Sequence, residues 1–272
     1  MASALSLPAR GSRAQYRRNT NNPMTSSSSK AIAIVPAFNE EASIGTLVTE
    51  IRERYPDLDV LVIDDGSADR TSEVARASGA IVLSLPCNLG VGGAVQAGFM
   101  YASDRQYDYA VRCDGDGQHP PEVLGDLLAE IRKNEVDLVI GSRHLSDEKY
   151  KNTLIRRCGI FGLSWLLTRI CRKPATDPTS GLQAFNRPLL YFFARRYPTD
   201  YPEPEALALM RRQGYDFSEV AATFRARETG VSSIGDLDTI YYIIKVFLAL
   251  VVDRARRIDP RYSKENIVEH LS

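Results

Sequence analysis

Two aspartates in a glycine-rich turn are the residues of this chain best suited to chemistry. Asp114 and Asp116 stand two apart in the segment DGDGQH, residues 114–119. Two carboxylates at this spacing can converge on one hard cation, and Asp and Gln oxygens suit Mg²⁺ or Mn²⁺, which bridges protein carboxylates and substrate phosphates. We therefore expect Asp114, Asp116 and Gln118 to hold a metal ion, with His119 orienting them. An Asp/Gly-rich surface turn is the alternative.

Other polar residues also stand where short apolar runs end. Asn39 and Glu41 follow one such run, Asp64 and Asp65 follow the next, and Asn88 follows a third. We expect strands at 31–35, 60–63, 81–85, 109–111 and 138–140, and helices at 41–54, 69–78, from the glycine-rich turn to about 103, and at 121–133. Strands that alternate with helices predict a mostly parallel α/β sheet, whose ligands bind beyond the carboxyl ends of the strands.

Two loops at these strand ends have the composition of nucleotide-binding segments. In DDGS, residues 64–67, Asp65 could accept hydrogen bonds from a base or a ribose, while Asp69 could cap the next helix. The segment NLGVGGA, residues 88–94, resembles a phosphate-cradling loop at a helix N-terminus. It lacks both the G-x-G-x-x-G spacing and the Lys-Ser/Thr of a P-loop, so close packing of the helix on the sheet is an equal alternative.

The composition excludes several classes of protein. The 272 residues carry 34 basic and 34 acidic side chains, which argues against a protein that binds nucleic acid mainly by neutralising phosphates. The 4 cysteines form no CxxC pair, so a zinc site or a disulfide framework is not expected. The sequence has no uncharged apolar run of about 18 residues, the length that a membrane span needs.

The sequence divides into three parts. Residues 1–30 are basic and serine-rich, with no acid before Glu40, and we expect a disordered leader; a transit peptide is the alternative. Residues 31–230 hold the strand and helix patterns of the sheet domain. Residues 231–272 hold an apolar helix and a tail, of which Ile240–Val252 is the apolar part, interrupted by Lys245.

The order of the motifs resembles a known family. PAFNEE, DDGS, NLGVGGA, DGDGQHPPE, GSRH and TDPTSGLQAFNR follow one another over residues 31–230 as in inverting family 2 glycosyltransferases of the GT-A fold. The resemblance is to the branch of dolichyl-phosphate mannosyltransferase and the bacterial polyprenyl-phosphate glycosyltransferases. It implies a Rossmann-like sheet flanked by helices, a UDP- or GDP-linked sugar donor, Mg²⁺ or Mn²⁺, and a polyprenyl phosphate acceptor.

The resemblance also implies roles for individual residues. It places in the nucleotide pocket Pro36, Ala37, Asn39, Glu41, Asp65 and Asp114. It makes Asp114, Asp116 and Gln118 the metal-binding positions. It also makes Asp114, Asp116 and Arg143 of GSR the catalytic residues. It points to an acceptor side formed by Arg157, Ser180, Glu205, Arg225 and Arg227. The chain departs from the branch in having DGDGQ for DADLQ and His144 where a tyrosine is usual, which leaves the acceptor open.

The chemistry of the acceptor separates the alternatives. A lipid phosphate is already ionised and needs no strong base, whereas a polysaccharide or glycolipid hydroxyl needs a carboxylate within hydrogen-bond reach. Asp200, Glu203 and Glu205 stand where relatives with hydroxyl acceptors carry that base, and turn or helix-start acids are the simpler interpretation. A third alternative is a non-catalytic subunit that binds a sugar nucleotide. A sugar nucleotidyltransferase is disfavoured because no glycine- and arginine-rich loop follows the first strand.

The apolar C-terminal stretch suggests contact with a membrane. At about 1.5 Å per residue its helix is about 20 Å long, too short for a hydrocarbon core of about 30 Å. Arg254, Arg256 and Arg257 follow it, as expected of an interfacial helix with basic anchors. A helix buried on the sheet domain or at a dimer contact is the alternative. We expect a cytoplasmic protein on the inner face of the membrane, with a small membrane-protein partner as a hypothesis and the oligomeric state left open.

Overall fold

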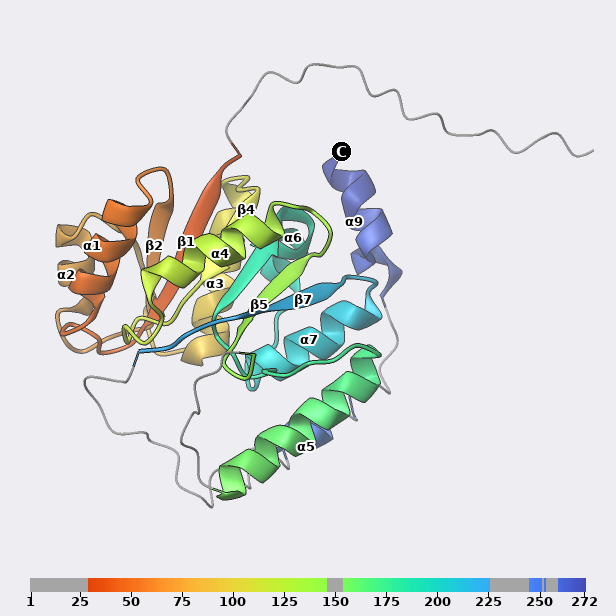
Figure 1. Cartoon of the computed structure of the whole chain (residues 1–272). Helices are drawn as coiled ribbons and strands as arrows, with labels where there is room; N and C mark the ends of the chain where they lie inside the picture. Colours follow the sequence, from red (N-terminus) through yellow and green to blue (C-terminus); the bar gives the residue numbers. More distant parts are fainter. Residues whose placement is uncertain (1–28, 146–153, 226–244, 251, 253–258) are drawn as a thin grey trace, which may run out of the picture.

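The computed structural model describes residues 29–145, 154–225, 245–250, 252 and 259–272 (Figure 1). A 7-stranded sheet with the order β3-β2-β1-β4-β6-β5-β7 runs through its centre. The strands are β1 (Ala31–Ala37), β2 (Asp59–Asp64), β3 (Ile81–Ser84), β4 (Tyr109–Arg112), β5 (Leu138–Ser142), β6 (Gln183–Asn186) and β7 (Phe217–Ala221). The predicted mostly parallel α/β sheet is confirmed. β6 is the exception, since it is antiparallel to both β4 and β5.

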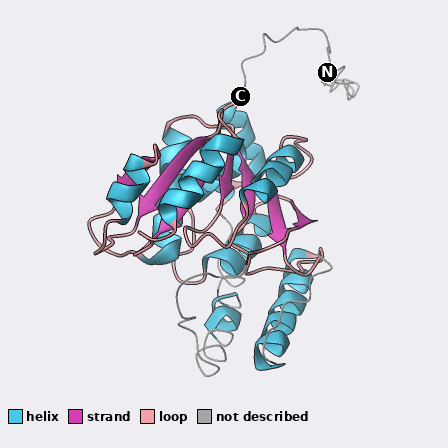
Figure 2. Ribbon diagram, turned by 60° about the vertical axis from the view of Figure 1, so that its left-hand side comes forward, coloured by secondary structure: helices cyan, strands magenta, loops and turns pink. Residues whose placement is uncertain are grey.

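Alternating residues of the buried strands face two separate cores. In β1, Ile32 and Ile34 pack with α3 and α6, whereas Ala33 and Val35 pack with α1 and α4. Side chains alternate in this way because successive residues of a strand point to opposite faces. Figure 2 shows helices on both faces of the sheet. This two-sided cover explains the continuous apolar composition of β1.

The helices begin and end close to the predicted residues in the first half of the chain. They are α1 (Ile44–Arg54), α2 (Thr71–Ala77), α3 (Gly90–Asp104), α4 (Pro121–Ile131), α5 (Leu154–Cys171), α6 (Arg187–Arg195), α7 (Pro202–Arg212) and α9 (Lys264–Leu271). Residues 245–250 are also helical, and Val246 and Leu250 pack into the core on the α3 and α6 side. Residues 1–28 of the predicted leader lie outside the described residues. The predicted division at residue 230 also lies outside them.

The antiparallel β6 brings a second group of loops to the site. β1, β2, β4 and β5 end at one edge of the sheet, the lower edge in Figure 1. β6 begins at that same edge, because Gln183 is paired with Arg112 of β4 and with Ile140 of β5. The residues that precede β6 therefore lie beside those that follow β4 and β5. Within the described chain, no helix is both long and apolar enough to cross a membrane.

Candidate active site

The turn that carries Asp114 and Asp116 is fixed to the end of β1. The backbone N–H of Gly115 donates to the Pro36 carbonyl at 3.2 Å, and the Ser43 hydroxyl donates to the Gly115 carbonyl at 2.9 Å. A Cβ on Gly115 would lie 3.1 Å from the Pro36 oxygen, a tight contact, so glycine lets the turn pack closely against the strand without displacing it. The two aspartates consequently have a defined position at the carboxyl edge.

Gln118 holds the Asp116 carboxylate in place. Its backbone N–H donates to Asp116 Oδ1 at 3.1 Å, and its Nε2 donates to Oδ2 at 2.6 Å. His119 holds the start of the turn: it is 4% exposed, and its Nδ1 accepts the backbone N–H of Asp114 at 2.9 Å. Burial lowers the pKa of His119 more than the nearby carboxylates raise it, so the imidazole is neutral. His119 therefore lies where it can orient the turn.

Asp114 has a cationic neighbour that was not among the predicted site residues. Arg112, the last residue of β4, is 1% exposed and places Nη2 3.3 Å from Asp114 Oδ1 and 2.8 Å from Glu203 Oε1. Burial raises the pKa of Asp114, but the charge and hydrogen bond of Arg112, together with smaller contributions from neighbours such as Arg143, outweigh it, so the pKa falls below the usual value. Asp114 is therefore an anion at neutral pH and can bind a cation.

The donor set fits a metal ion that takes its remaining ligands from the substrate. Within the described chain, no three His, Cys, Asp or Glu residues are placed to hold a metal by themselves. Mg²⁺ is commonly bound by only one or two carboxylates plus substrate phosphates, and Asp114 and Asp116 supply two. Gly181 lets the chain approach Asp114, since a Cβ there would lie 2.7 Å from Asp114 Oδ2.

The predicted nucleotide-binding residues lie in three loops that are joined by hydrogen bonds from side chains. Asn39, with φ of 56°, donates its backbone N–H to Ser67 Oγ and accepts the Ala68 N–H at its Oδ1. Glu41 Oε2 accepts the Arg70 N–H at 3.1 Å. Asp65, buried at the end of β2, accepts the Leu89 N–H at 2.7 Å. These contacts give the predicted nucleotide-binding residues fixed positions next to Pro36 and Ala37, the last residues of β1.

Arg143 of the GSR motif is held by an aspartate from the loop before β6. Its Nε and Nη2 each lie 2.7 Å from a different oxygen of Asp177, whose side chain is 0% exposed. Burial raises the pKa of Asp177, but the hydrogen bonds and the charge of Arg143 together lower it by more than burial raises it. The pKa is therefore below its usual value, and the pair is ionised. Glu219 accepts the backbone N–H groups of Thr176 and Asp177. The guanidinium is thereby fixed, and its charge also lowers the pKa of Asp114.

The loop that carries Asp177 is fastened to α5 and to β5. Ser164 donates its hydroxyl to the Ala175 carbonyl, and the Ala175 N–H donates to Thr168 Oγ1 at 3.1 Å. Ser180 is buried, and its hydroxyl donates to the Gly141 carbonyl at 2.6 Å. Ser180, which the family resemblance placed on the acceptor side, therefore holds the loop in this structure.

Comparison with known proteins identifies this arrangement. The family model described as Glycosyl transferase family 2 matches residues 32–192. The chain belongs to this family. Undecaprenyl-phosphate mannosyltransferase of Micrococcus luteus is 34% identical over 218 residues, which cover 75% of this chain and 87% of that protein. An uncharacterised protein of Methanocaldococcus jannaschii is 38% identical over 155 residues, 56% of this chain and 63% of that protein.

A solved structure shows that this family 2 glycosyltransferase has the GT-A fold. It is glucosyl-3-phosphoglycerate synthase from Mycobacterium tuberculosis in complex with Mn²⁺, UDP and glucosyl-3-phosphoglycerate. The likeness has a TM-score of 0.64 at 22% identity and covers 85% of this chain and 82% of that chain. At this identity the likeness concerns the fold, and the predicted fold is confirmed.

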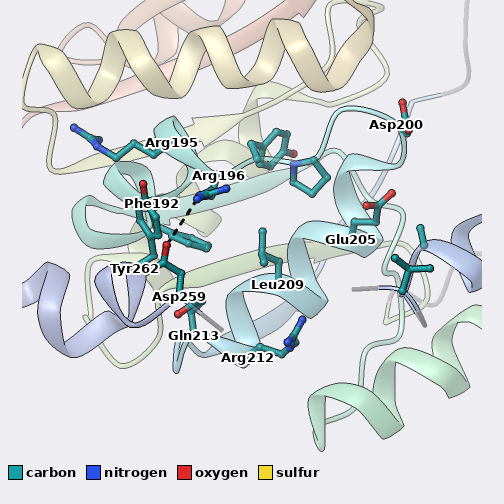
Figure 3. Close-up of a pocket in the computed structure, with 14 residues that line it drawn as sticks. Phe192, Arg195, Arg196, Asp200, Glu205, Leu209, Arg212, Gln213, Asp259 and Tyr262 are labelled. Carbon is teal, nitrogen blue, oxygen red and sulfur yellow. Dashed lines mark ion pairs between the residues drawn. The ribbon is translucent and has the colours of Figure 1, made fainter. Parts of the chain in front are cut away.

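The predicted acceptor residues of the glycosyltransferase have different surroundings in the structure. The Arg225 guanidinium pairs with Glu50 of α1 at 2.9 Å and with Glu122 of α4 at 3.8 Å. The backbone N–H of Arg225 donates to the backbone carbonyl of Gln118, in the turn that carries the aspartates. Glu205 lines a pocket of about 630 Å³ between α6, α7 and the helix at 245–252. Figure 3 shows Glu205 and Asp200 together at one side of it. Arg227 and the side chain of Arg157 lie outside the described residues.

Two charged residues of the site, Asp177 and Arg112, were not predicted from the sequence, and a third, Glu203, was considered only as a possible base or a helix-start acid. Asp177 lies inside the quoted TDPTSG motif, so an acid next to a predicted arginine was available as a signal. Arg112 had only a weak signal, a charged residue at the end of an apolar strand. Glu203 was considered as a base, whereas the structure pairs it with Arg112.

Proposed function

We propose that this glycosyltransferase moves a sugar from a nucleotide-linked donor to a polyprenyl phosphate, with inversion at the anomeric carbon. The observation that carries the proposal is the pairing of two features at one sheet edge. The anionic turn of Asp114 and Asp116 lies within electrostatic reach of Arg143, which Asp177 holds rigidly. Such an edge suits a donor diphosphate beside an anionic acceptor. The name of the Micrococcus luteus relative supports the acceptor class.

Each part of the site has a role in this reaction. Asn39, Glu41 and Asp65 shape the pocket for the nucleoside, and Asp114 with Asp116 bind a divalent cation. When bound, Mg²⁺ or Mn²⁺ neutralises the leaving diphosphate. Arg143 attracts the acceptor phosphate, because a fixed guanidinium recognises phosphate oxygens without having to be ordered on binding.

The environment of the nearby acids favours an acceptor that needs no base. Glu203 is the acid that Arg112 brings next to Asp114, and its carboxylate pairs with a fully buried guanidinium. This carboxylate is only 13% exposed and is held by the guanidinium, so it is poorly placed to take a proton from an acceptor hydroxyl. A phosphate nucleophile is already ionised and attacks without one. This environment supports a lipid phosphate over a hydroxyl acceptor.

A matched pair of acceptors tests the proposal. Purified full-length protein is treated with EDTA and then given UDP- or GDP-linked sugars with or without Mn²⁺. The acceptors are a polyprenyl phosphate and the polyprenol of the same length, which differ only in the phosphate. We expect a glycosylated lipid from the phosphate alone, only with Mn²⁺, and with an inverted anomeric carbon by NMR. Transfer to the polyprenol, or no transfer to either lipid, contradicts the proposal.

Two helices support peripheral association with the membrane. One face of α5 is buried and carries Leu163, Leu167 and Cys171. Two aromatic residues of the same helix, Phe161 and Trp165, are 74% and 57% exposed. The helix at 245–250 likewise exposes Phe247 and Leu248. Both helices lie on the same side of the molecule, beyond the carboxyl edge of the sheet (Figures 1 and 2). We infer that these aromatic and apolar residues contact the bilayer that contains the lipid acceptor.

Tryptophan fluorescence measures this contact directly, because the chain has 1 tryptophan. We expect the emission of Trp165 to shift to the blue when vesicles containing phosphatidylglycerol are added. Phe161→Ser and Phe247→Ser should weaken co-sedimentation with the vesicles by several-fold, since each removes about 2 kcal/mol or less of apolar burial. Met100→Ser, at an apolar residue of α3 that is as exposed as Phe247, is the control. Unshifted emission, with the protein left in the supernatant, contradicts membrane contact and favours a membrane-protein partner.

A further inference from the structure

A fully buried arginine connects the metal-binding turn to a helix almost a hundred residues further along the chain. Arg112 contacts Asp114, two residues beyond it, and Glu203 in the first turn of α7. The Tyr197 hydroxyl lies 3.5 Å from Nη1, and among the described residues Nε has no hydrogen-bond partner. A buried charge is costly unless it is paired, and here two carboxylates share one guanidinium. This arrangement therefore fixes the relative positions of both acids.

A second contact fixes the segment from Tyr197 to Glu203. Gly92 of α3 lies against this segment so closely that a Cβ at position 92 would be 2.4 Å from the Thr199 carbonyl oxygen. Glu203 is only 13% exposed and cannot turn into solvent without breaking its ion pair. The start of α7 thus has one polar anchor, Arg112, and one steric anchor, Gly92. Only the polar anchor also reaches Asp114.

We propose that Arg112 is a positioning residue of the glycosyltransferase, which uses Glu203 as a support to hold Asp114 in the orientation that binds the donor diphosphate and its metal. The inference rests on the proposed role of Asp114 as a metal ligand and is independent of the acceptor. Arg112 itself does not touch the substrate. Without its charge, Asp114 and Glu203 are neighbouring carboxylates that repel each other, and the aspartate leaves its position.

The shape of the guanidinium matters as well as its charge. Arg112 contacts both carboxylates through one nitrogen, Nη2, which the planar guanidinium holds in a fixed direction, whereas the lysine ammonium is a compact charge on a shorter stem. Arg112→Lys therefore keeps the charge and removes the bridge. Arg112→Met removes both, and the double variant Arg112→Met, Glu203→Gln also removes the acid that is then left buried and unpaired.

The test combines a binding measurement with kinetics. Titration calorimetry measures the binding of UDP, or of GDP if the wild type prefers it, in the presence of Mn²⁺. We expect Arg112→Lys to weaken this binding and to lower kcat by about 10–100-fold, the usual effect of losing the partner of a metal ligand. Glu203→Gln should have a similar effect alone and no further effect in the Arg112→Met background, because it acts through Arg112. Arg54→Met, at an exposed ion pair with Glu122, is the control.

Three outcomes overturn the inference. If Arg112→Lys binds UDP and Mn²⁺ as the wild type does and turns over equally fast, Arg112 positions nothing. If Glu203→Gln lowers kcat while UDP and Mn²⁺ still bind normally, Glu203 is a base rather than a support. If thermal unfolding shows that the variants lose activity only as they lose their fold, the role of Arg112 is structural. If the wild-type protein binds neither UDP nor GDP in the presence of Mn²⁺, that result contradicts the proposed function, and the inference about Arg112 fails with it.

Discussion

Asp116→Ala is expected to lower kcat/KM for sugar transfer by about 10²–10³-fold, because the site loses one of its two anionic ligands for the cation that stabilises the leaving diphosphate. The fold should survive the change. The Asp116 side chain is partly exposed, and it accepts hydrogen bonds from Gln118 in the same turn. The turn keeps its attachment to β1 through Gly115 and Ser43.

The measurement is a Mn²⁺ titration of initial rates, with circular dichroism to check the fold. Asp57→Ala removes an exposed aspartate outside the site and serves as the matched control. The control should titrate like the wild type. A variant lacking Asp116 that reaches the wild-type rate at the same Mn²⁺ concentration would contradict the metal role.

Asp177→Asn is expected to reduce both stability and the use of the acceptor. The substitution keeps the size of the side chain and removes the charge that holds Arg143. Breaking a fully buried ion pair costs about 3–5 kcal/mol; because the Arg143 side chain is 21% exposed, we expect a loss of about 2 kcal/mol in the free energy of unfolding. The KM for polyprenyl phosphate should rise more than kcat falls, since the guanidinium loses its fixed orientation. Urea denaturation and acceptor kinetics measure the two effects.

The stability difference between Asp177→Asn and the wild type should depend on pH. The folded pKa of Asp177 is below its usual value, and an unfolded aspartate titrates near about 3.9. The carboxylate therefore stabilises the fold fully above about pH 4, and this stabilisation is lost as the pH falls through the folded pKa. The urea midpoints of the two proteins should converge in acid. A gap that stays constant down to pH 2–3 would show that Asp177 does not act through its charge.

The sequence predicts the parallel part of the fold because local pattern and tertiary environment agree there. β1 is apolar along its whole length and is covered on both faces, so the apolar run and the buried strand coincide. β6 is different. Its four residues, Gln183–Asn186, carry no pattern of their own and form a strand only by pairing with β4 and β5. Its reversed direction, which brings Asp177 to the site, cannot be predicted from local sequence.

The candidate site also has a part that can be predicted from local sequence and a part that cannot. Asp114 and Asp65 follow predicted strands, so the parallel topology alone places them at one edge. The partners of Arg143 and Asp114 depend on contacts between distant segments. Arg112 is recognisable as a site residue only once Glu203, from another element, is seen to share its guanidinium.

The attachment of Ala175 to α5 would set the height of the site above the bilayer if the proposed membrane contact of α5 is made. The loop with Asp177 leaves the end of α5 and is fastened back to that helix through Ser164 and Thr168. If α5 rests on the bilayer, the arginine held by Asp177 is carried at a constant distance from the headgroups. A phosphate joined to a long isoprenoid tail would then meet its sugar without leaving the membrane surface.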